Sequence, residues 1–197
     1  MRYFLIALAI LLVMGCVFDS ENPLTDPDKE QIDKSLLGTW FWVDEKESGF
    51  IHVGLDEKSH LLRLLMVDFD KNQEVEASEF LGHTSSLEGK KYLNLKWVHP
   101  TQEDVSGYIF VKYAVSSDSL GIALIDSDAA EKAVKSGALK GTLKKDKWSY
   151  PVHVTEGQKK LRDFVIRNDR ALFPEMKYLH KLELPKQLPK RTGKPTA

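Results

Sequence analysis

The groups in this chain that could do chemistry are its histidines, its carboxylates and a lone cysteine, and their spacing gives no support to catalysis. No two histidines stand at i and i+4 on a helix with a Glu nearby, and a single cysteine cannot complete a zinc site. The chain has no Gly-x-Ser-x-Gly elbow, no phosphate-binding loop and no dinucleotide fingerprint, and no pair of carboxylates stands out for acid–base work. We therefore expect a non-catalytic protein that carries no cofactor.

Residues 68–79 carry oxygen-bearing side chains at a spacing that suits a calcium ion. The pattern resembles an EF-hand loop and would make four residues the metal ligands, namely Asp68, Asp70, Asn72 and Glu79. However, Gln73 stands where that family has a glycine for the sharp turn, and the residues after Ser78 suit an exiting helix poorly. A β-hairpin turning at residues 70–72 is the favoured interpretation, with a weak calcium site in the turn as the alternative.

The N-terminal segment has the pattern of a targeting signal. Met1-Arg2 precedes an apolar run over residues 3–14 and then Gly15-Cys16, which is typical of a secretory signal peptide. The run is too short to cross the ~30 Å hydrocarbon core of a bilayer, which takes roughly 20 helical residues. Val13-Met14-Gly15-Cys16 resembles the lipobox of bacterial lipoproteins, with Met14 bulkier than the usual residue. The alternatives are an ordinary cleaved signal with a chance cysteine, or an uncleaved anchor.

The lipoprotein resemblance implies how the mature chain is anchored. Residues 1–15 would be removed as the signal peptide, and the thiol of Cys16 would be acylated. Two or three acyl chains give stable anchoring, since each buried methylene contributes ~0.8 kcal/mol. Val17 stands where many inner-membrane lipoproteins have Asp, which implies sorting to the outer membrane, facing the periplasm. The expected partner is therefore the membrane, and the expected location is the bacterial cell envelope.

The mature chain is predicted to consist of a tether, one domain and a tail. Residues 16–35 are polar, are interrupted by Pro23 and Pro27, and are predicted to be a flexible tether. Residues 36–183 are predicted to form a single β-barrel domain, and residues 184–197 a disordered basic tail. A contact of this tail with anionic lipid or another polyanion is the less favoured alternative, because no aromatic residues interleave with its basic ones.

Residues 36–125 contain several segments in which apolar and polar residues alternate. Leu93, Leu95 and Trp97, for example, share one face of the segment 92–98. Alternation of this kind, with turn residues at intervals of about 8 to 12 positions, predicts an antiparallel barrel or sandwich. The predicted strands are residues 36–43, 49–54, 60–69, 77–87, 92–98, 107–115 and 120–125.

Two helices are predicted after these strands. The first covers residues 128–136, with Asp128 and Glu131 as a capping box and a stop at Gly137. The second is longer and amphipathic, covers residues 156–172, and ends before Pro174. Short strands are expected at residues 139–143 and 151–154, and a last strand at residues 177–182.

Gly38-Thr39-Trp40 opens the first strand of the predicted domain. It resembles the Gly-x-Trp at the start of the first lipocalin strand, where the indole closes the bottom of the barrel. The order of strands, late amphipathic helix and final strand is also similar to that of lipocalins. The resemblance implies a mainly β fold, an antiparallel lipocalin-like β-barrel with a short inserted helix and a C-terminal amphipathic helix. An ordinary core tryptophan is the alternative.

Aromatic side chains are numerous enough to line a cavity inside such a barrel. Trp40 and Trp42 share a strand face, as do Tyr108 and Phe110, since side chains alternate along a strand. Aromatic residues also commonly fill a closed core, which is the alternative. The candidate ligand-binding residues are Trp40, Trp42, Trp97, Tyr108 and Phe110.

Composition bounds the remaining function classes. The chain has 197 residues and a formal net charge of −1, which gives no reason to expect nucleic acid as a partner. We predict a lipid-anchored, non-catalytic protein of the cell envelope that binds a small apolar ligand or lipid in its barrel. An interaction or structural module without an internal ligand is the alternative, and calcium binding through residues 68–79 is less favoured. The sequence names neither the ligand nor a protein partner.

Overall fold

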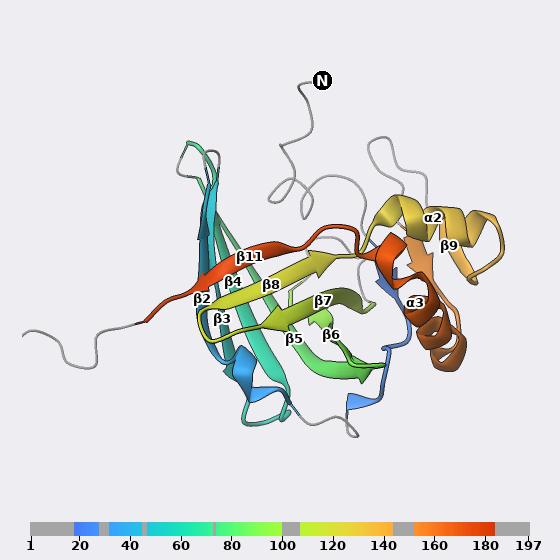
Figure 1. Ribbon diagram of the computed structural model, residues 1–197, viewed down its shortest axis with the longest axis horizontal. Coiled ribbons are helices and arrows are strands. Elements are labelled where there is room, and N and C mark those ends of the chain that lie inside the picture. The colour runs from blue at the N-terminus through green and yellow to red at the C-terminus, as the bar shows by residue number, and fades with distance from the viewer. Residues whose placement is uncertain are drawn as a thin grey trace, which may run out of the picture.

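The computed structural model describes residues 18–27, 32–44, 47–72, 74–99, 107–143 and 152–183. The protein is mainly β, with a closed eight-stranded barrel and two helices (Figure 1). The predicted fold class, an antiparallel lipocalin-like β-barrel with a short inserted helix and a C-terminal amphipathic helix, is confirmed. The barrel strands are β2 (Gly38–Val43), β3 (Ser48–Leu55), β4 (Leu62–Phe69), β5 (Val75–Leu87), β6 (Lys90–Trp97), β7 (Ile109–Val115), β8 (Ser119–Leu124) and β11 (Lys177–Lys181).

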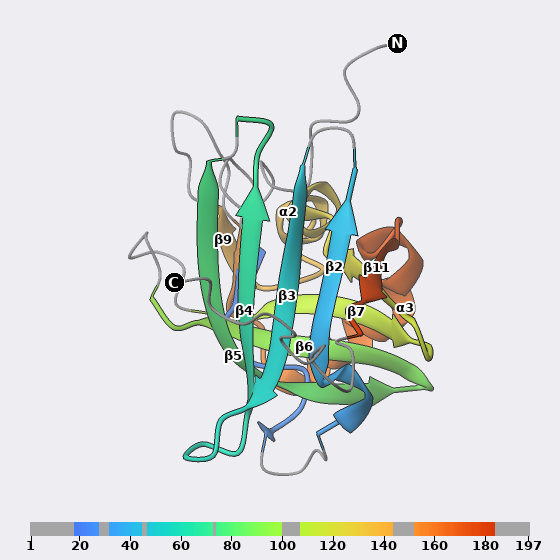
Figure 2. The ribbon, with the colours of Figure 1, turned by 90° about the vertical axis from the view of Figure 1, so that its left-hand side faces the viewer.

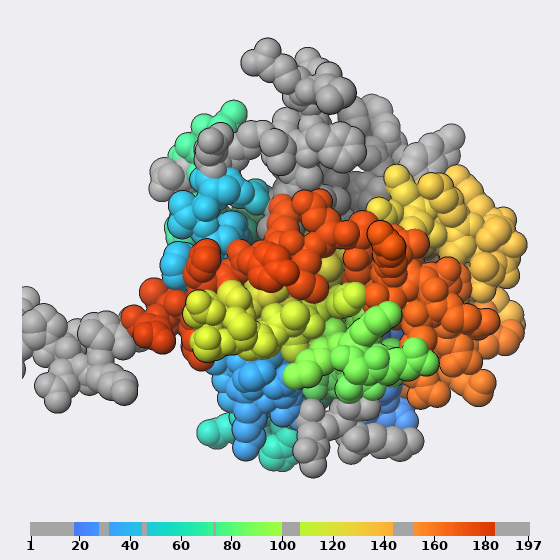
Figure 3. Space-filling view, in the orientation of Figure 1, coloured from blue at the N-terminus to red at the C-terminus, as the bar shows by residue number. Residues whose placement is uncertain are grey.

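The last strand, β11, closes the barrel. Strands β2 to β8 follow one another as antiparallel neighbours, and β11 pairs antiparallel with both β8 and β2. The space-filling view shows β8 and β11 packed side by side (Figure 3). Closure removes the exposed strand edges that an open sheet would present. The connection from β8 to β11 is long, because it contains both helices and two short strands that belong to a second layer.

The second layer is a small three-stranded sheet with the two helices. Its strands are β1 (Phe18–Ser20), β10 (Val152–Val154) and β9 (Gly141–Leu143), with β1 parallel and β9 antiparallel to β10. The helices are α2 (Ser127–Lys135) and α3 (Gln158–Leu172). This layer lies on one side of the barrel, and Figure 2 shows β2 to β5 on the opposite side without such a cover.

Two hydrophobic cores lie on the two faces of the barrel wall. Along β6, Leu93 and Leu95 belong to the core inside the barrel, whereas Tyr92 belongs to the core under the second layer. Successive side chains of a strand point to opposite faces, so one strand can supply both cores. The outer core also contains Val152 and Val154 of β10, which makes the second layer part of the same folded body as the barrel.

The predicted flexible tether, residues 16–35, is wrong for residues 18–27. Phe18–Ser20 is a buried strand, and the ring of Phe18 lies 5.5 Å from that of Phe110 on the outer wall. Leu24 is fully buried, and its N–H donates to the side chain of Asn94 at 2.7 Å. Burial of Phe18 and Leu24 and the parallel pairing of β1 therefore order this segment, although its polar composition predicted a flexible tether. The predicted signal peptide, Cys16 and the tail at residues 184–197 lie outside the described residues.

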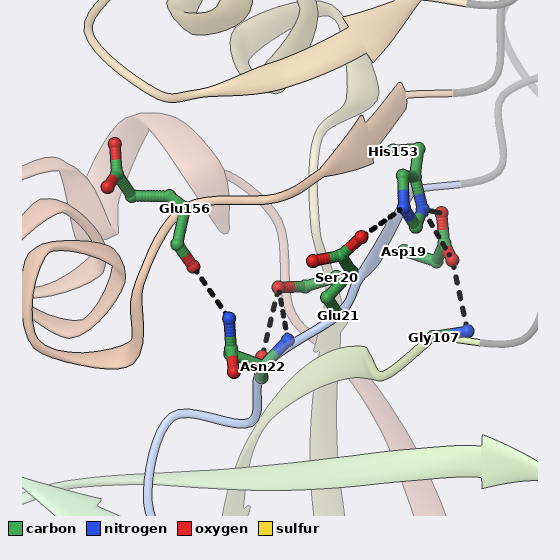
Figure 4. Close-up of polar contacts among 7 residues, drawn as sticks. All are labelled: Asp19, Ser20, Glu21, Asn22, Gly107, His153 and Glu156. Carbon is green, nitrogen blue, oxygen red and sulfur yellow. Dashed lines mark hydrogen bonds and ion pairs between the residues drawn. The ribbon is translucent and has the colours of Figure 1, made fainter.

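A buried carboxylate holds β1 against its neighbours (Figure 4). The side chain of Asp19 is 3% exposed and accepts hydrogen bonds from Nδ1 of His153 at 3.0 Å and from the N–H of Gly107 at 3.0 Å. Nε2 of His153 also lies 3.4 Å from a carboxylate oxygen of Glu21. Although burial opposes protonation, the hydrogen bond to Asp19 and the two negative charges raise the pKa of His153 above its usual value. The hydrogen bond between His153 and Asp19 thus links β10 to β1.

The helices differ from their predicted ends in local detail. The N-cap of α2 is Asp126, whose carboxylate accepts from the N–H of Ala129 at 2.8 Å. The predicted capping box of Asp128 and Glu131 is therefore wrong, and Glu131 instead forms an ion pair with Lys135 one turn later. The predicted stop at Gly137 is confirmed by its φ of +74°, a conformation that favours glycine. α3 ends at Leu172 as expected but begins at Gln158.

The strands predicted at residues 139–143 and 151–154 exist as β9 and β10, and they pair with each other; β10 also pairs with β1, so both strands belong to the small sheet rather than to the barrel.

The Asp19–His153 pair makes stability depend on pH. Because the folded pKa of His153 is raised, its contribution is fully present below the unfolded pKa of ~6.5 and is lost as pH rises through the folded value. We expect His153→Gln to remove about 1 kcal/mol of stability at pH 6 and less at pH 8.5. Urea denaturation followed by tryptophan fluorescence measures this, with His99→Gln, an exposed site, as the control. Equal pH slopes in His153→Gln and the unmodified protein would contradict the assignment.

Candidate functional site: the cavity inside the barrel

The barrel encloses a cavity of about 80 Å³. Its walls come from inward-facing positions of all the barrel strands, together with Leu36, which precedes β2. The lining is apolar apart from one carboxyl group, that of Asp68. The lining residues are Leu36, Trp42, Ile51, Val53, Leu64, Met66, Asp68, Phe80, Leu93, Leu95, Ile109, Val111, Leu120, Ile122, Leu124 and Leu179.

Trp40 closes one end of the barrel. It is fully buried, and its indole N–H donates to the backbone oxygen of Leu36 at 2.8 Å. Leu36 ends a short 3-10 helix, η2 (Lys34–Leu36), and Nζ of Lys181 lies 5.3 Å from the ring of Trp40. Gly38 makes the turn into β2 with a φ of +127°, which an L side chain rarely adopts. We call this the Trp40 end, and the opposite end, where β2 and β4 finish, the far end.

Hydrogen bonds at Asp33 fix the cover of the Trp40 end. Its carboxylate accepts from Nζ of Lys91 at 2.7 Å, from the hydroxyl of Tyr113 at 3.1 Å and from the N–H of Ser35 at 3.0 Å. Partial burial raises the pKa of Asp33, but these hydrogen bonds together have the larger effect and lower it to about 2. The cover is thus tied to two strands of the wall, and the Trp40 end is a structural closure.

Trp42 lies on the cavity wall nearer the far end. Its ring occupies the space above Gly49, where a Cβ atom would come within 2.4 Å of the indole. Gly49 is therefore required for the indole to lie against the wall. The N–H of Trp42 is buried and has no hydrogen-bond partner among the described residues. A donor left in this state destabilises the folded protein by about 1–3 kcal/mol unless a ligand or water accepts its hydrogen bond.

Trp97 is a second buried indole without a partner. It sits at the end of β6 on the inward face, with its ring 4.3 Å from that of Phe80, which lines the cavity. Its N–H also lacks a hydrogen-bond partner in the described part of the chain. Native proteins pair most buried donors with protein groups or ordered water, so both indole N–H groups are available to donate to a molecule at this end of the barrel.

Asp68 brings a carboxyl group to the same end of the cavity. It faces inward from β4, directly opposite Glu76 of β5 in the strand register, and next to Gly49 of β3. Burial, together with the nearby charges of Glu47 and Glu76, raises the pKa of Asp68 to about 6. The group is therefore mostly ionised at neutral pH, in a wall that otherwise presents carbon atoms.

The structure divides the five predicted ligand-binding aromatics into three groups. Trp42 lines the cavity, and Trp40 closes the end of the barrel. The ring of Trp97 packs against that of Phe80, which lines the cavity. Tyr108 and Phe110 do not face the cavity, which corrects their prediction. Alternation along β7 turns Ile109 and Val111 inward, so these two rings enter the outer core under the second layer.

The predicted calcium ligands are not brought together. Asp68 points into the barrel, whereas Glu79 lies on the outer face and forms an ion pair with Arg63. Asp70 accepts from the N–H groups of Asn72 and Glu74, each at 2.8 Å, as expected for a hairpin turn. The hairpin interpretation is therefore confirmed, and the four-ligand calcium set is wrong because its members lie on opposite faces of the hairpin. Gln73 lies outside the described residues.

The role of Asp68 as a cavity residue was not predicted from the sequence. The signal was available, because Leu64, Met66 and Asp68 share one face of an apolar strand. The resemblance to an EF-hand loop instead led to the prediction that Asp68 is a metal ligand in the hairpin turn. Within the described ranges, no group of three or more His, Cys, Asp or Glu side chains is arranged to hold a metal ion.

None of the helices in the described part of the chain is both long and apolar enough to cross a membrane. Comparisons with models of protein families, with curated proteins and with solved structures found no match to this chain.

We expect Asp68→Asn to stabilise the protein at neutral and alkaline pH. Because the folded pKa of Asp68 is raised, the ionised group destabilises the fold increasingly as pH rises from about 4 through 6. The amide removes this effect, which amounts to at most about 3 kcal/mol for two pKa units, less after allowance for solvent screening. Thermal unfolding of both proteins at pH 4.5 and pH 8 measures it. A larger gain in stability at pH 4.5 than at pH 8 would contradict the account.

Proposed function

We propose that this protein is a lipid-anchored, non-catalytic protein of the bacterial cell envelope that binds a small apolar ligand inside its barrel. The apolar cavity behind the Trp40 closure is the observation that carries this proposal. A solid core would leave no space for a ligand, whereas this barrel keeps an enclosed volume lined by aliphatic and aromatic side chains. Apolar cavities of this kind stay dry and take up apolar molecules.

The size of the cavity favours a slender ligand. Its volume of about 80 Å³ is several times the ~10–15 Å³ that a single water requires. It is well below the ~300–1,000 Å³ of sites for drug-sized molecules. A single alkyl chain or one small ring suits such a space better than a fused-ring compound does.

The lining supports a binding role rather than a catalytic one. The described side chains that line the cavity include one titratable group, Asp68, and no hydroxyl, thiol, imidazole or amine. General acid–base or nucleophilic catalysis works through at least a reacting group and a second group that activates it. Binding needs neither.

Membrane attachment rests on the sequence. The lipobox-like residues 13–16 motivate acylation of Cys16, and Val17 motivates sorting to the outer membrane. The fold adds a constraint, because β1 starts at Phe18, two residues after Cys16. Two residues span at most ~7 Å, so acyl chains on Cys16 would hold the second layer close to the bilayer.

Ligand binding is tested with adjacent substitutions on β4. Leu64 lines the cavity and Leu65 faces outward with 43% exposure, so Leu64→Phe and Leu65→Phe make the same change on opposite sides of the wall. With the chain from residue 17, which contains every described element, we expect Leu64→Phe to weaken binding of decanol at least tenfold by reducing the space. Leu65→Phe is the control and should bind as the unmodified protein does. Isothermal titration calorimetry measures both, with circular dichroism to verify folding. Equal affinities for decanol in the two variants would place it outside the barrel.

Anchoring is tested at Cys16. We expect Cys16→Ser to abolish labelling by radioactive palmitate and to release the protein from the membrane fraction, because the acylated atom is gone. Met14→Ala keeps the cysteine and should be labelled and sedimented normally. Membrane retention of Cys16→Ser equal to that of Met14→Ala would refute the anchor and leave the cavity proposal untouched.

An interaction module without an internal ligand is the second candidate. It is favoured by exposed apolar side chains on the wall that the second layer leaves uncovered, where Val43 is 74% and Val75 59% exposed. These residues lie in one register row across β2 to β5. Ser48 and Phe69 lie between them in that row, and exposed apolar side chains on one face of a sheet favour a contact surface. A folded protein that binds no apolar probe would favour this candidate.

A further inference from the structure

We propose that the ligand is a hydrophobic amine, with its alkyl chain in the cavity and its ammonium group on the carboxylate of Asp68. This inference rests on the proposed function, because it names the chemical class that the same cavity selects. It starts from one contrast on the cavity wall: fifteen of the sixteen lining residues are apolar, and the remaining one is an acid.

Asp68 has no counter-charge among the residues that the structure describes. No hydrogen bond or ion pair within the described residues involves its carboxyl group, and its pKa is shifted by burial and by like charges alone. A carboxylate in such a position destabilises the fold unless a cation pairs with it. An ammonium group can pair with it and donate hydrogen bonds to it.

The charged residues next to Asp68 at the far end are acidic. Glu76 faces Asp68 across the β4–β5 pair, and Glu47, in the segment between β2 and β3, also acts on it. The neighbouring strand β3 brings Gly49, which carries no charge. Lys177, at the start of β11, is an exposed basic residue near this end, and β11 is three strands from β4 in the barrel order. The acids next to Asp68 therefore attract a cation and repel a fatty-acid carboxylate.

Trp42 places an aromatic ring next to Asp68 on the cavity wall. Its indole covers Gly49, the residue that pairs with Asp68 in the register, so an aromatic ring stands beside the carboxylate on the cavity wall. A tryptophan ring attracts a cation by about 0.5–2 kcal/mol in addition to the ion pair. An ammonium group has no lone pair that could accept hydrogen bonds from the indole N–H groups of Trp42 and Trp97, so these donors favour an oxygen-bearing ligand instead. A neutral alcohol is thus the competing outcome of the test.

The experiment compares three ligands that share one chain and differ in charge: decylamine, decanol and decanoate. With the chain from residue 17 at pH 7.5 and low salt, we expect decylamine to bind about tenfold more tightly than decanol, and decanoate most weakly. Asp68→Asn should reduce the affinity for decylamine to that for decanol. Glu74→Gln, an exposed acid in the adjacent turn, removes the same charge and should leave the preference intact.

The pH dependence gives an independent readout. Because the pairing needs the ionised carboxylate, the affinity for decylamine should fall as pH is lowered through about 6, and the affinity for decanol should not. Decanol binding at least as tightly as decylamine, or an unchanged preference in Asp68→Asn, overturns the amine inference and keeps the proposed function. Failure of all three ligands to bind the folded protein overturns both.

Discussion

The wall formed by β5, β6 and β7 is buried on both faces, and the rest of the structure depends on this constraint. Its inward side chains fill the barrel, and its outward ones meet the second layer. Polar outward residues are paired: Asn94 accepts from the N–H of Leu24 and donates to Ser85, and Asp169 of α3 accepts from Tyr92 and Lys112. A polar group that is paired when buried adds specificity, so each pair fixes where one piece of the second layer docks.

The second layer stabilises one side of the barrel from outside, and the cavity lies within the barrel. The Trp40 end is filled by the indole and η2, and the remaining space lies along the strands towards Trp42 and Asp68. Two buried indole donors and one unpaired acid then stand at the end opposite the plug. Such groups lower stability unless a ligand or water pairs with them.

Alternation predicted the barrel strands because one buried face repeats every second residue, and Trp40 was recognisable as a plug whose N–H needs a partner. Other features were beyond this reasoning. Strand β1 is three residues long and pairs with β10 more than a hundred positions away, so it leaves no periodic pattern. In β7 the outward face carries Phe110 next to the inward Ile109, so the two apolar neighbours did not show which of them faces the cavity. Asp68 matched a turn ligand because the pattern of acids runs from the strand into the hairpin.

The early start of β1 has a consequence for where such a protein could work. Because Phe18 is already part of a strand, a lipid on Cys16 would hold the folded domain to the membrane through a link of only two residues. Reach, rotation and tilt would all be restricted to a thin zone above the lipid head groups. A ligand would have to reach the barrel by diffusion or on a soluble carrier protein. The anchored barrel itself could not cross the compartment to bind it.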